Sequence, residues 1–269
     1  MNLRRKIRRY EARQVCHDYG GVPLTVYLAD ELSELYYDYD WLELPEIAFL
    51  RRHKLKLGAR VFELGAHQCV VALMLSNVVG PEGLVVAVEA NLHNVTVGQK
   101  NRDFNRAEQL HVLHAAVAER SGEVLFNEGL NGQVTRGTSE LGQVEVQAFS
   151  IDDLSQEYGV PDVLFIDVNG SEYQVLQGAR QSLSHAPDCC IKVYAGAGLE
   201  HFGGSVAQIL SFFPETNYKL FVASEAKLLT PEQSSSPDAK AKFTELTPGD
   251  NGLKSTFYLI AIDLKSGFS

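Results

Sequence analysis

The sequence lacks most features that mark secreted, membrane-spanning or metal-binding proteins. Its 269 residues include four cysteines, and none has the C-x-x-C spacing of a metal or redox site. No run of about 18 apolar residues is present to form a membrane-spanning helix. The basic start MNLRRKIRRY has no apolar stretch of the kind found in a signal peptide. We therefore expect free thiols, no resident metal and a cytoplasmic protein.

Positive charge is also scarce. The formal net charge of -10 argues against a protein that binds nucleic acid by neutralising phosphates. Residues 14–50 contain eight acids but no lysine or arginine, and they follow a basic segment directly. Residues 2–19 have a loose helical pattern, so we expect a helix whose cations pair with the acidic segment. Docking of this helix on a membrane surface or a partner is the alternative.

What the sequence does have is an alternation of apolar strand-like runs and helical patterns. We predict strands at 22–28, 60–64, 84–89, 110–114, 162–167, 189–194, 217–223 and 256–262, and helices at 68–79, 92–105, 171–184 and 204–213. The two ends of segment 123–149 also alternate like strands, and Asn91 and Ser150 are expected helix N-caps. This alternation is typical of a parallel sheet with helices on both faces. We expect residues 1–55 to form an extension that packs on one globular unit, residues 56–269.

The stretch Val61–Asn91 has the order strand, small-residue turn, helix, strand and acid. Glu89 ends the second strand, where an acidic side chain accepts the hydroxyls of a ribose. The G-x-G-x-x-G pattern of dinucleotide enzymes is absent, and Glu63 stands where that motif has its first glycine. A carboxylate at this position would repel a pyrophosphate and attract a cation. The stretch therefore favours S-adenosylmethionine (SAM) over NAD.

A second group of polar residues follows the later strands. Asp167 ends a buried strand, and an acid there is costly unless it serves a ligand or a proton transfer. Glu172 lies in the first turn of the next helix, where an acid also complements the helix dipole. His201 follows the fifth strand and is either a general base or a surface histidine. Lys192 lies within a buried strand and is expected to pair with an acid or to extend to the sheet edge.

Together these motifs resemble the FkbM-type methyltransferases, a branch of the class I SAM-dependent enzymes. The resemblance covers roughly residues 40–200 and rests on ELGAH at 63–67, GPEG at 80–83, VEAN at 88–91, HAAVAERSGEV at 114–124, SIDDL at 150–154 and DVNGSEYQVLQGA at 167–179. It implies an α/β, Rossmann-like fold with a mostly parallel seven-stranded sheet, one antiparallel strand and helices on both faces. It also implies the methylation of a hydroxyl group.

The resemblance implies that SAM lies across the carboxyl edge of the sheet. We expect the methionine moiety at residues 63–68, the ribose at Glu89 and the adenine beside Ala115 and Ala116. The full set of expected cofactor-binding residues is Glu63, Gly65, Ala66, His67, Gln68, Glu89, Ala90, Asn91, Ala115, Ala116 and Asp167. Proton removal from the acceptor is assigned to Asp167, with Glu172 and His201 as further candidates.

The sequence thus favours an O-methyltransferase that acts on a small molecule or glycan, such as a sugar or a natural product. Two departures from the family pattern, Cys69 and Asn169, together with the basic N-terminal helix, motivate a second hypothesis, a catalytically degenerate protein with a binding or scaffold role. His67 replaces an asparagine, Cys69 a glycine, Asn169 a glutamate and Ala90 a proline. The wall that contacts the acceptor is expected within residues 30–50, 127–143 and 224–255. The aromatic side chains Tyr36, Tyr37, Tyr39 and Trp41 are either half-buried packing residues, the interpretation we favour, or part of this wall. Self-association into a homo-oligomer stays open.

Overall fold

The main sheet has parallel strands at its centre and an antiparallel strand near one edge. The computed structural model describes residues 10–127, 133–134, 143–224, 243–247 and 253–266. Among these, eight strands are ordered β13-β12-β14-β11-β10-β3-β4-β5. Five neighbours run parallel: β11 (Asp188–Val193), β10 (Val163–Ile166), β3 (Arg60–Leu64), β4 (Leu84–Glu89) and β5 (Leu110–His114). Strand β14 (Phe257–Asp263) is antiparallel to both of its neighbours, β11 and β12 (Tyr218–Ser224).

The predicted seven-stranded sheet with one antiparallel strand is confirmed. It consists of the strands from β12 to β5, in which only β14 runs against the others in the described part of the chain. The two-residue strand β13 (Thr244–Glu245) pairs antiparallel with β12 and extends this sheet by one more strand. No sequence pattern predicts β13, because two residues are too few to show an alternation.

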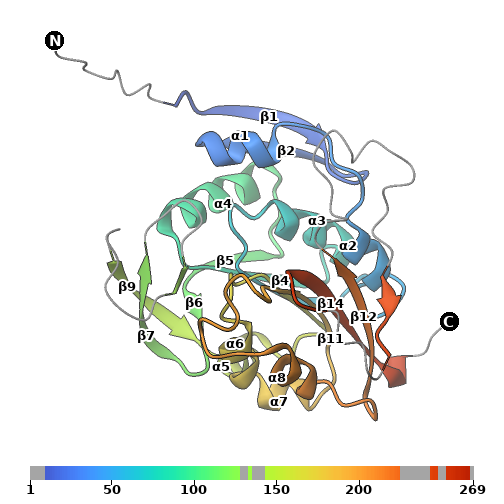
Figure 1. Cartoon of the computed structure of the whole chain (residues 1–269). Helices are drawn as coiled ribbons and strands as arrows, with labels where there is room; N and C mark the ends of the chain where they lie inside the picture. Colours follow the sequence, from blue (N-terminus) through green and yellow to red (C-terminus); the bar gives the residue numbers. More distant parts are fainter. Residues whose placement is uncertain (1–9, 128–132, 135–142, 225–242, 248–252, 267–269) are drawn as a thin grey trace.

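Helices cover both faces of the sheet (Figure 1). One face carries α2 (Pro45–Leu50), α3 (Val70–Val79) and α4 (Leu92–Phe104), and the other carries α5 (Ile151–Tyr158), α6 (Glu172–Gln177), α7 (Arg180–Leu183) and α8 (Val206–Ser211). Alternate strand residues enter two separate cores: Val61 and Phe165 pack in one, and Phe62 and Leu164 in the other. Both faces are therefore apolar, as the continuous apolar runs predict. No helix within the described ranges is long and apolar enough to cross a membrane.

The helix starts follow their predicted caps. The Asn91 side chain accepts hydrogen bonds from the backbone of His93 and Asn94 at the start of α4, and the Ser150 hydroxyl accepts one from Asp153 at the start of α5. The helix predicted over 171–184 is wrong in its continuity, because it breaks into α6 and α7 at Gly178. A Cβ at Gly178 would lie 2.5 Å from the Ala118 carbonyl oxygen, so the chain approaches another backbone closely at the break.

The prediction of a helix over residues 2–19 is wrong where the structure describes it. Residues 13–18 form β1 (Arg13–Asp18), which pairs antiparallel with β2 (Pro23–Leu28). Residues 2–9 lie outside the described residues. Gly20 and Gly21 both have positive φ in the connecting turn, which allows the chain to reverse. The strand predicted at 22–28 is confirmed as β2, and α1 (Glu31–Tyr37) follows it. Of the expected ion pairs, Arg13 contacts Glu34 and Asp38, each at 2.6 Å.

The hairpin packs on α4 through side-chain amides. Asn101 accepts a hydrogen bond from the Tyr27 backbone N–H at 2.7 Å, and Asn105 accepts one from Thr25 at 2.9 Å. Asn101 also donates to the carbonyl of Gln68 at 2.9 Å. One buried asparagine therefore connects the hairpin to the loop after β3. The boundary between residues 55 and 56 stays a prediction.

A second sheet flanks the main one and has the order β6-β9-β7-β8. Its strands are β6 (Ala116–Val117), β7 (Gly122–Asn127), β8 (Gln133–Val134) and β9 (Gln143–Phe149). The predicted strand character at both ends of segment 123–149 is confirmed, since β7 and β9 pair antiparallel. Much of the loop 127–143 and of the tail 224–255 lies outside the described residues.

The close contact of α3 with α4 gives a first testable prediction. A Cβ at Gly98 would lie 2.6 Å from the Cys69 Sγ atom. Gly98→Ala should therefore lower the free energy of unfolding by about 1–3 kcal/mol, the usual cost of overpacking. Adding Cys69→Ala removes the colliding sulfur, so the double variant should lose less stability than the two single variants summed. Chemical denaturation of all four proteins measures this coupling, and strictly additive losses would contradict the contact.

Candidate functional site

Residues at the ends of four strands lie side by side at the carboxyl edge of the sheet. Leu64, Ile166 and Ile191 stand side by side in the pairings of β3, β10 and β11. The next residues along these chains, Gly65, Asp167 and Lys192, are therefore also neighbours. Lys192 is paired with Tyr258 of β14. Because side chains alternate along a strand, Glu63 points to the same face of the sheet as Asp167 and Lys192. This is the face that carries α2 and α3.

These side chains line a cavity of about 330 Å³. Its lining includes nine of the eleven predicted cofactor-binding residues: Glu63, Gly65, Ala66, His67, Glu89, Ala90, Ala115, Ala116 and Asp167. Tyr36 and Tyr37 also line it, so these two aromatic residues belong to the wall of the cavity, the alternative that the sequence favoured less. Tyr39 and Trp41 are not among the lining residues.

Gly65 permits the tight turn after β3. Its φ is +88°, and a Cβ would lie 1.9 Å from the Asp167 carbonyl oxygen, so a larger residue would collide with the backbone. Glu89 then holds the loop after this turn. Its carboxylate accepts hydrogen bonds from the backbone N–H groups of His67 at 2.8 Å and Asn91 at 2.7 Å. Each carboxylate oxygen has capacity for a further hydrogen bond, so Glu89 is still able to accept ribose hydroxyls.

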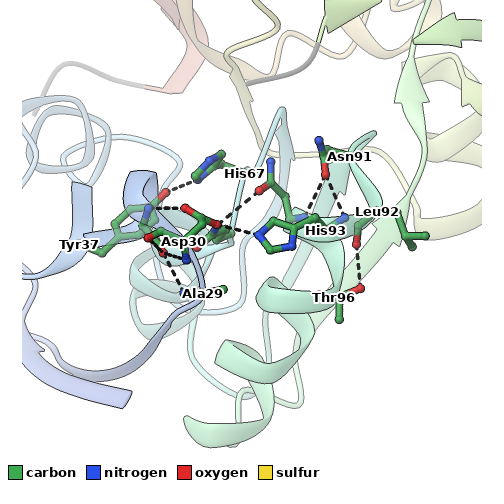
Figure 2. A network of polar contacts seen from close by, with 11 residues as sticks. Ala29, Asp30, Tyr37, His67, Asn91, Leu92, His93 and Thr96 are labelled. Carbon is green, nitrogen blue, oxygen red and sulfur yellow. Dashed lines mark hydrogen bonds and ion pairs between the residues drawn. The ribbon is translucent and has the colours of Figure 1, made fainter. Parts of the chain in front are cut away.

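The imidazole of His67 is neutral, and one of its two nitrogens makes no hydrogen bond to the described residues. Burial lowers the pKa of His67 to about 4. Its Nδ1 atom lies 2.6 Å from the Tyr37 hydroxyl, and burial raises the pKa of Tyr37 well above its usual value (Figure 2). We infer that the protonated hydroxyl donates to Nδ1, which leaves the imidazole proton on Nε2. This Nε2 atom is buried and has no hydrogen-bond partner among the described residues.

Buried carboxyl groups dominate the electrostatics of the cavity. Burial raises the pKa of Glu63 well above its usual range, and the nearby Asp167 and Glu89 raise it further. Burial raises the pKa of Glu89 too, although several hydrogen bonds oppose the shift. Burial raises the pKa of Glu46, on α2, to about 7. The Oε2 atoms of Glu46 and Glu63 are buried without a hydrogen-bond partner in the described structure. Such a site favours a cationic ligand over an anionic one.

Lys192 lines the cavity and lies beside the carboxylate of Asp167. Its Nζ atom lies 3.9 Å from Asp167 Oδ2, which confirms the predicted pairing. The ammonium group also lies 5.0 Å from the ring centroid of Tyr194 and 5.9 Å from that of Tyr258. The Tyr194 hydroxyl donates to Asp167 Oδ1 at 2.8 Å. Asp167 therefore holds both a cation and a phenol at this end of the cavity.

Asp30 ties α1 to the loop after β3 (Figure 2). Its carboxylate accepts hydrogen bonds from Gln68 at 2.8 Å and from the backbone of Ser33 at 2.7 Å, and it lies 2.7 Å from His93 Nε2. Burial alone would raise the pKa of Asp30, but the contacts with His93, Ser33 and Gln68 outweigh it and lower the pKa. An ionised Asp30 thus braces Gln68, the neighbour of His67.

Four predicted site residues do not line the cavity. Gln68 and Asn91 act behind it, since Gln68 bonds Asp30 and Asn91 caps α4. Glu172 is fully buried, and its Oε1 atom accepts a hydrogen bond from the Gly170 N–H at 2.6 Å, which fixes the turn after β10. His201 is exposed, and its ring contacts Phe202. The structure therefore brings Asp167 to the cavity but neither Glu172 nor His201.

The residues that sequence reasoning missed include the lining residues Glu46, Tyr194 and Tyr258 and the bracing residue Asp30. Glu46 had a usable signal, because it is a single acid within the otherwise apolar helix PEIAFL. Tyr194 and Tyr258 become part of the cavity only through the pairing of β11 with β14 and the position of Asp167. Asp30 had the signal of a capping box with Ser33, but its contact with Gln68 joins residues 38 positions apart.

A match between the sequence and a family model identifies the domain that contains this cavity. The model of the methyltransferase FkbM domain matches residues 63–220, which is more than half of the chain. The chain belongs to the FkbM methyltransferase family. The matched range begins at Glu63 and includes Glu89 and Asp167. Tyr37 and Glu46 precede it, so the segment before the FkbM domain completes the cavity.

The solved structures that resemble this FkbM-family chain are distant. A methyltransferase FkbM from Methylobacillus flagellatus KT is 18% identical over 85% of this chain, with a TM-score of 0.48. The match covers 47% of that protein, so the chain spans about half its length. A SAM-dependent O-methyltransferase from Thermotoga maritima is 12% identical, with 93% of this chain and 77% of that chain covered and a TM-score of 0.45. Among curated proteins, none matches this sequence.

Three of the four departures from the FkbM pattern share a backbone feature. His67, Cys69 and Asn169 all have left-handed backbones, with φ of 48°, 63° and 53°. Histidine and asparagine are enriched in this conformation among non-glycine residues. Cys69 is fully buried, and its sulfur is directed to Gly98 of α4 and not to the cavity. Each of the three residues therefore occupies a tight turn of the backbone in this chain.

The buried acid on α2 gives a second prediction. The pKa of Glu46 rises from an ordinary 4.5 to about 7 on folding. Between these values the unfolded chain loses the proton while the folded protein keeps it, so this group costs stability as the pH rises. Glu46→Gln should therefore gain stability over the wild type by an amount that is small at pH 5 and on the order of 2–3 kcal/mol larger at pH 8.

Chemical denaturation of the ligand-free proteins at pH 5, 6, 7 and 8 measures this difference. A stability difference that stays constant with pH, or that shrinks toward pH 8, would contradict the buried, protonated state of Glu46.

Proposed function

We propose that this chain is a SAM-dependent O-methyltransferase that acts on a hydroxyl group of a small molecule or glycan. The observation that carries the proposal is the acid-lined cavity of an FkbM-family domain, in which Glu63 presents a buried oxygen without a partner and Glu89 lies beside the loop. SAM carries an amino group and a sulfonium, which match these acids. The pyrophosphate of NAD would meet the same acids and be repelled.

The polar atoms of the cavity fit the two ends of this ligand. Glu63 Oε2 would accept from the amino group of the methionine moiety, and the His67 Nε2–H would donate to its carboxylate. Glu89 would accept the ribose hydroxyls. Ala115 and Ala116 are 1% and 2% exposed and line the cavity, and their small side chains leave room for a flat adenine. The buried atoms without partners thus become satisfied by one ligand.

Methyl transfer requires of the protein mainly that it positions the two reactants. Bound SAM supplies a methyl group on a sulfonium sulfur, and the protein must align the acceptor with it and exclude water. Tyr36, Tyr37 and Tyr258 provide aromatic walls for this purpose. Of the three residues expected to accept the proton, Asp167 lines the cavity, but Tyr194 and Lys192 hold its oxygens. We therefore assign Asp167 to orienting these two side chains at the acceptor end.

A scaffold role without catalysis draws on the departures at Cys69 and Asn169. The Cys69 side chain does not line the cavity, and Asn169 lines it with a polar amide. Neither change removes Glu63, Glu89 or Asp167. Methyl transfer therefore remains the function that the cavity supports best.

Binding of S-adenosylhomocysteine, the demethylated cofactor, tests the proposal. Titration calorimetry should show saturable binding, and Glu89→Gln should weaken it by about 10–100-fold because one charged acceptor of the ribose hydroxyls is lost. Glu82→Gln, an exposed acid in the turn before β4, serves as the control and should leave binding unchanged. No binding at millimolar ligand, or binding of NADH in its place, would contradict the proposal.

Methyl transfer itself requires a separate assay. Wild type and Glu89→Gln are incubated with SAM and a broad panel of sugars and hydroxylated metabolites, and the products are analysed by mass spectrometry. An O-methylated product that is lost in the variant supports catalysis. Cofactor binding without product across the panel would favour the scaffold role, and an N- or C-methylated product would contradict O-specific transfer.

A further inference from the structure

The cavity contains one buried carboxyl group that the proposed binding of SAM does not use. Glu46 lies on α2, ahead of the matched FkbM range. It is 7% exposed and lines the cavity, and its Oε2 atom has no hydrogen-bond partner in the described part of the chain. A buried polar atom of this kind is costly to the fold unless a ligand satisfies it.

The formation of helix α2 does not explain why the Glu46 side chain is buried. An acid in the first turn of a helix interacts favourably with the helix dipole, and an exposed side chain would do so equally well. Glu43, three residues earlier, shows this ordinary alternative, because it is exposed and pairs with Arg51 at 2.7 Å. Glu46 instead points inward, where desolvation is expensive. The position therefore points to a role toward a ligand.

Glu46 lies beside the part of the cavity formed by β10 and β11, on the opposite side of β3 from Glu89 and Ala115. The cofactor would occupy the ends of β3, β4 and β5, where Glu63, Glu89 and Ala115 lie. Glu46 interacts electrostatically with Asp167 and Lys192, which follow or end the neighbouring strands β10 and β11. An acceptor hydroxyl must enter from this side, because the other side is taken by ribose and adenine.

We propose that Glu46 takes the proton from the acceptor hydroxyl during methyl transfer, an inference that rests on the proposed function above. As the acceptor oxygen bonds to the methyl carbon, the carbon–sulfur bond breaks and its electron pair stays on sulfur. The hydroxyl proton passes to Glu46 Oε2 and from there to solvent after product release. Atoms and charge balance, since the sulfonium becomes a neutral thioether and the carboxylate becomes a carboxylic acid.

The surroundings of Glu46 suit a proton acceptor near neutral pH. Burial raises the pKa of Glu46 to about 7, its own backbone N–H lowers it, Asp167 raises it and Lys192 lowers it. Cys190 and Tyr258 also face the group, and burial raises the pKa of both well above their usual values, so both stay neutral. A general base is most effective when its pKa lies near the working pH. Asp167 lacks this freedom because Tyr194 and Lys192 hold its oxygens.

A pair of cofactor analogues tests the position of Glu46 without a known acceptor. Sinefungin carries an ammonium group where SAM carries its methyl sulfonium, and S-adenosylhomocysteine has a neutral sulfur there. The ratio of their dissociation constants isolates the charge facing the transfer point, since the rest of the two ligands is the same. In the wild type, the preference for sinefungin should grow as the pH rises from 6 to 8 and Glu46 ionises.

The isosteric variant Glu46→Gln should abolish this pH-dependent preference, with at least a fivefold loss of the ratio at pH 8 and S-adenosylhomocysteine affinity within about twofold of wild type. Glu43→Gln is the matched control, with the same change of charge three residues away on an exposed side chain, and it should retain the wild-type ratio. Infrared difference spectra between wild type and Glu46→Gln should show a protonated carboxyl band at pH 6 that disappears when sinefungin binds.

The outcomes separate the two levels of the proposal. An unchanged ratio in Glu46→Gln, or a carboxyl band that persists with sinefungin bound, overturns the role of Glu46 while cofactor binding stands. Failure of both analogues to bind the wild-type protein contradicts the proposed function itself.

Discussion

A carboxyl group that leaves water must find a counter-charge, a hydrogen bond or a proton, and the sheet of this protein brings several such groups to one edge. Parallel strands end together, so Glu63, Glu89 and Asp167 reach the same cavity although they are far apart in the sequence. Helix α2 adds Glu46 from above the sheet face. Lys192 lies beside Asp167, and burial raises the pKa of Glu46, Glu63 and Glu89. The edge is therefore prepared for a ligand that brings positive charge with it.

The segment before the FkbM domain is part of this arrangement. Tyr37 fixes the tautomer of His67, and Asp30 braces the adjacent Gln68 (Figure 2). Asn101 connects the hairpin to the same loop by hydrogen bonds to Tyr27 and Gln68. Tyr37, Asp30 and the hairpin, which all contribute to holding this loop, therefore lie before the range that the family model matches. The family domain provides the strand ends, and the preceding residues provide one wall of the cavity and the buried acid Glu46.

The sequence predicted what depends on local pattern and missed what depends on tertiary position. The apolar runs predicted the strands, and Asn91 and Ser150 predicted two helix starts, because caps act within a few residues. The helix expected at residues 2–19 failed where β1 forms, since its alternation is stabilised by pairing with β2. Nine predicted cofactor residues line the cavity because motif and strand end coincide. The catalytic candidate Glu172 does not line the cavity, because its carboxylate accepts a hydrogen bond from the Gly170 N–H.

The number of protons released on cofactor binding is the most direct test of whether the buried acids ionise when a cationic ligand binds. Calorimetric titration of SAM at pH 6.5 in two buffers of different ionisation enthalpy gives the number of protons exchanged, and S-adenosylhomocysteine gives the value without the sulfonium charge. If the acids ionise to meet the ligand, SAM should release roughly half a proton per site more than S-adenosylhomocysteine. Equal exchange for the two ligands, or proton uptake with SAM, would contradict the account.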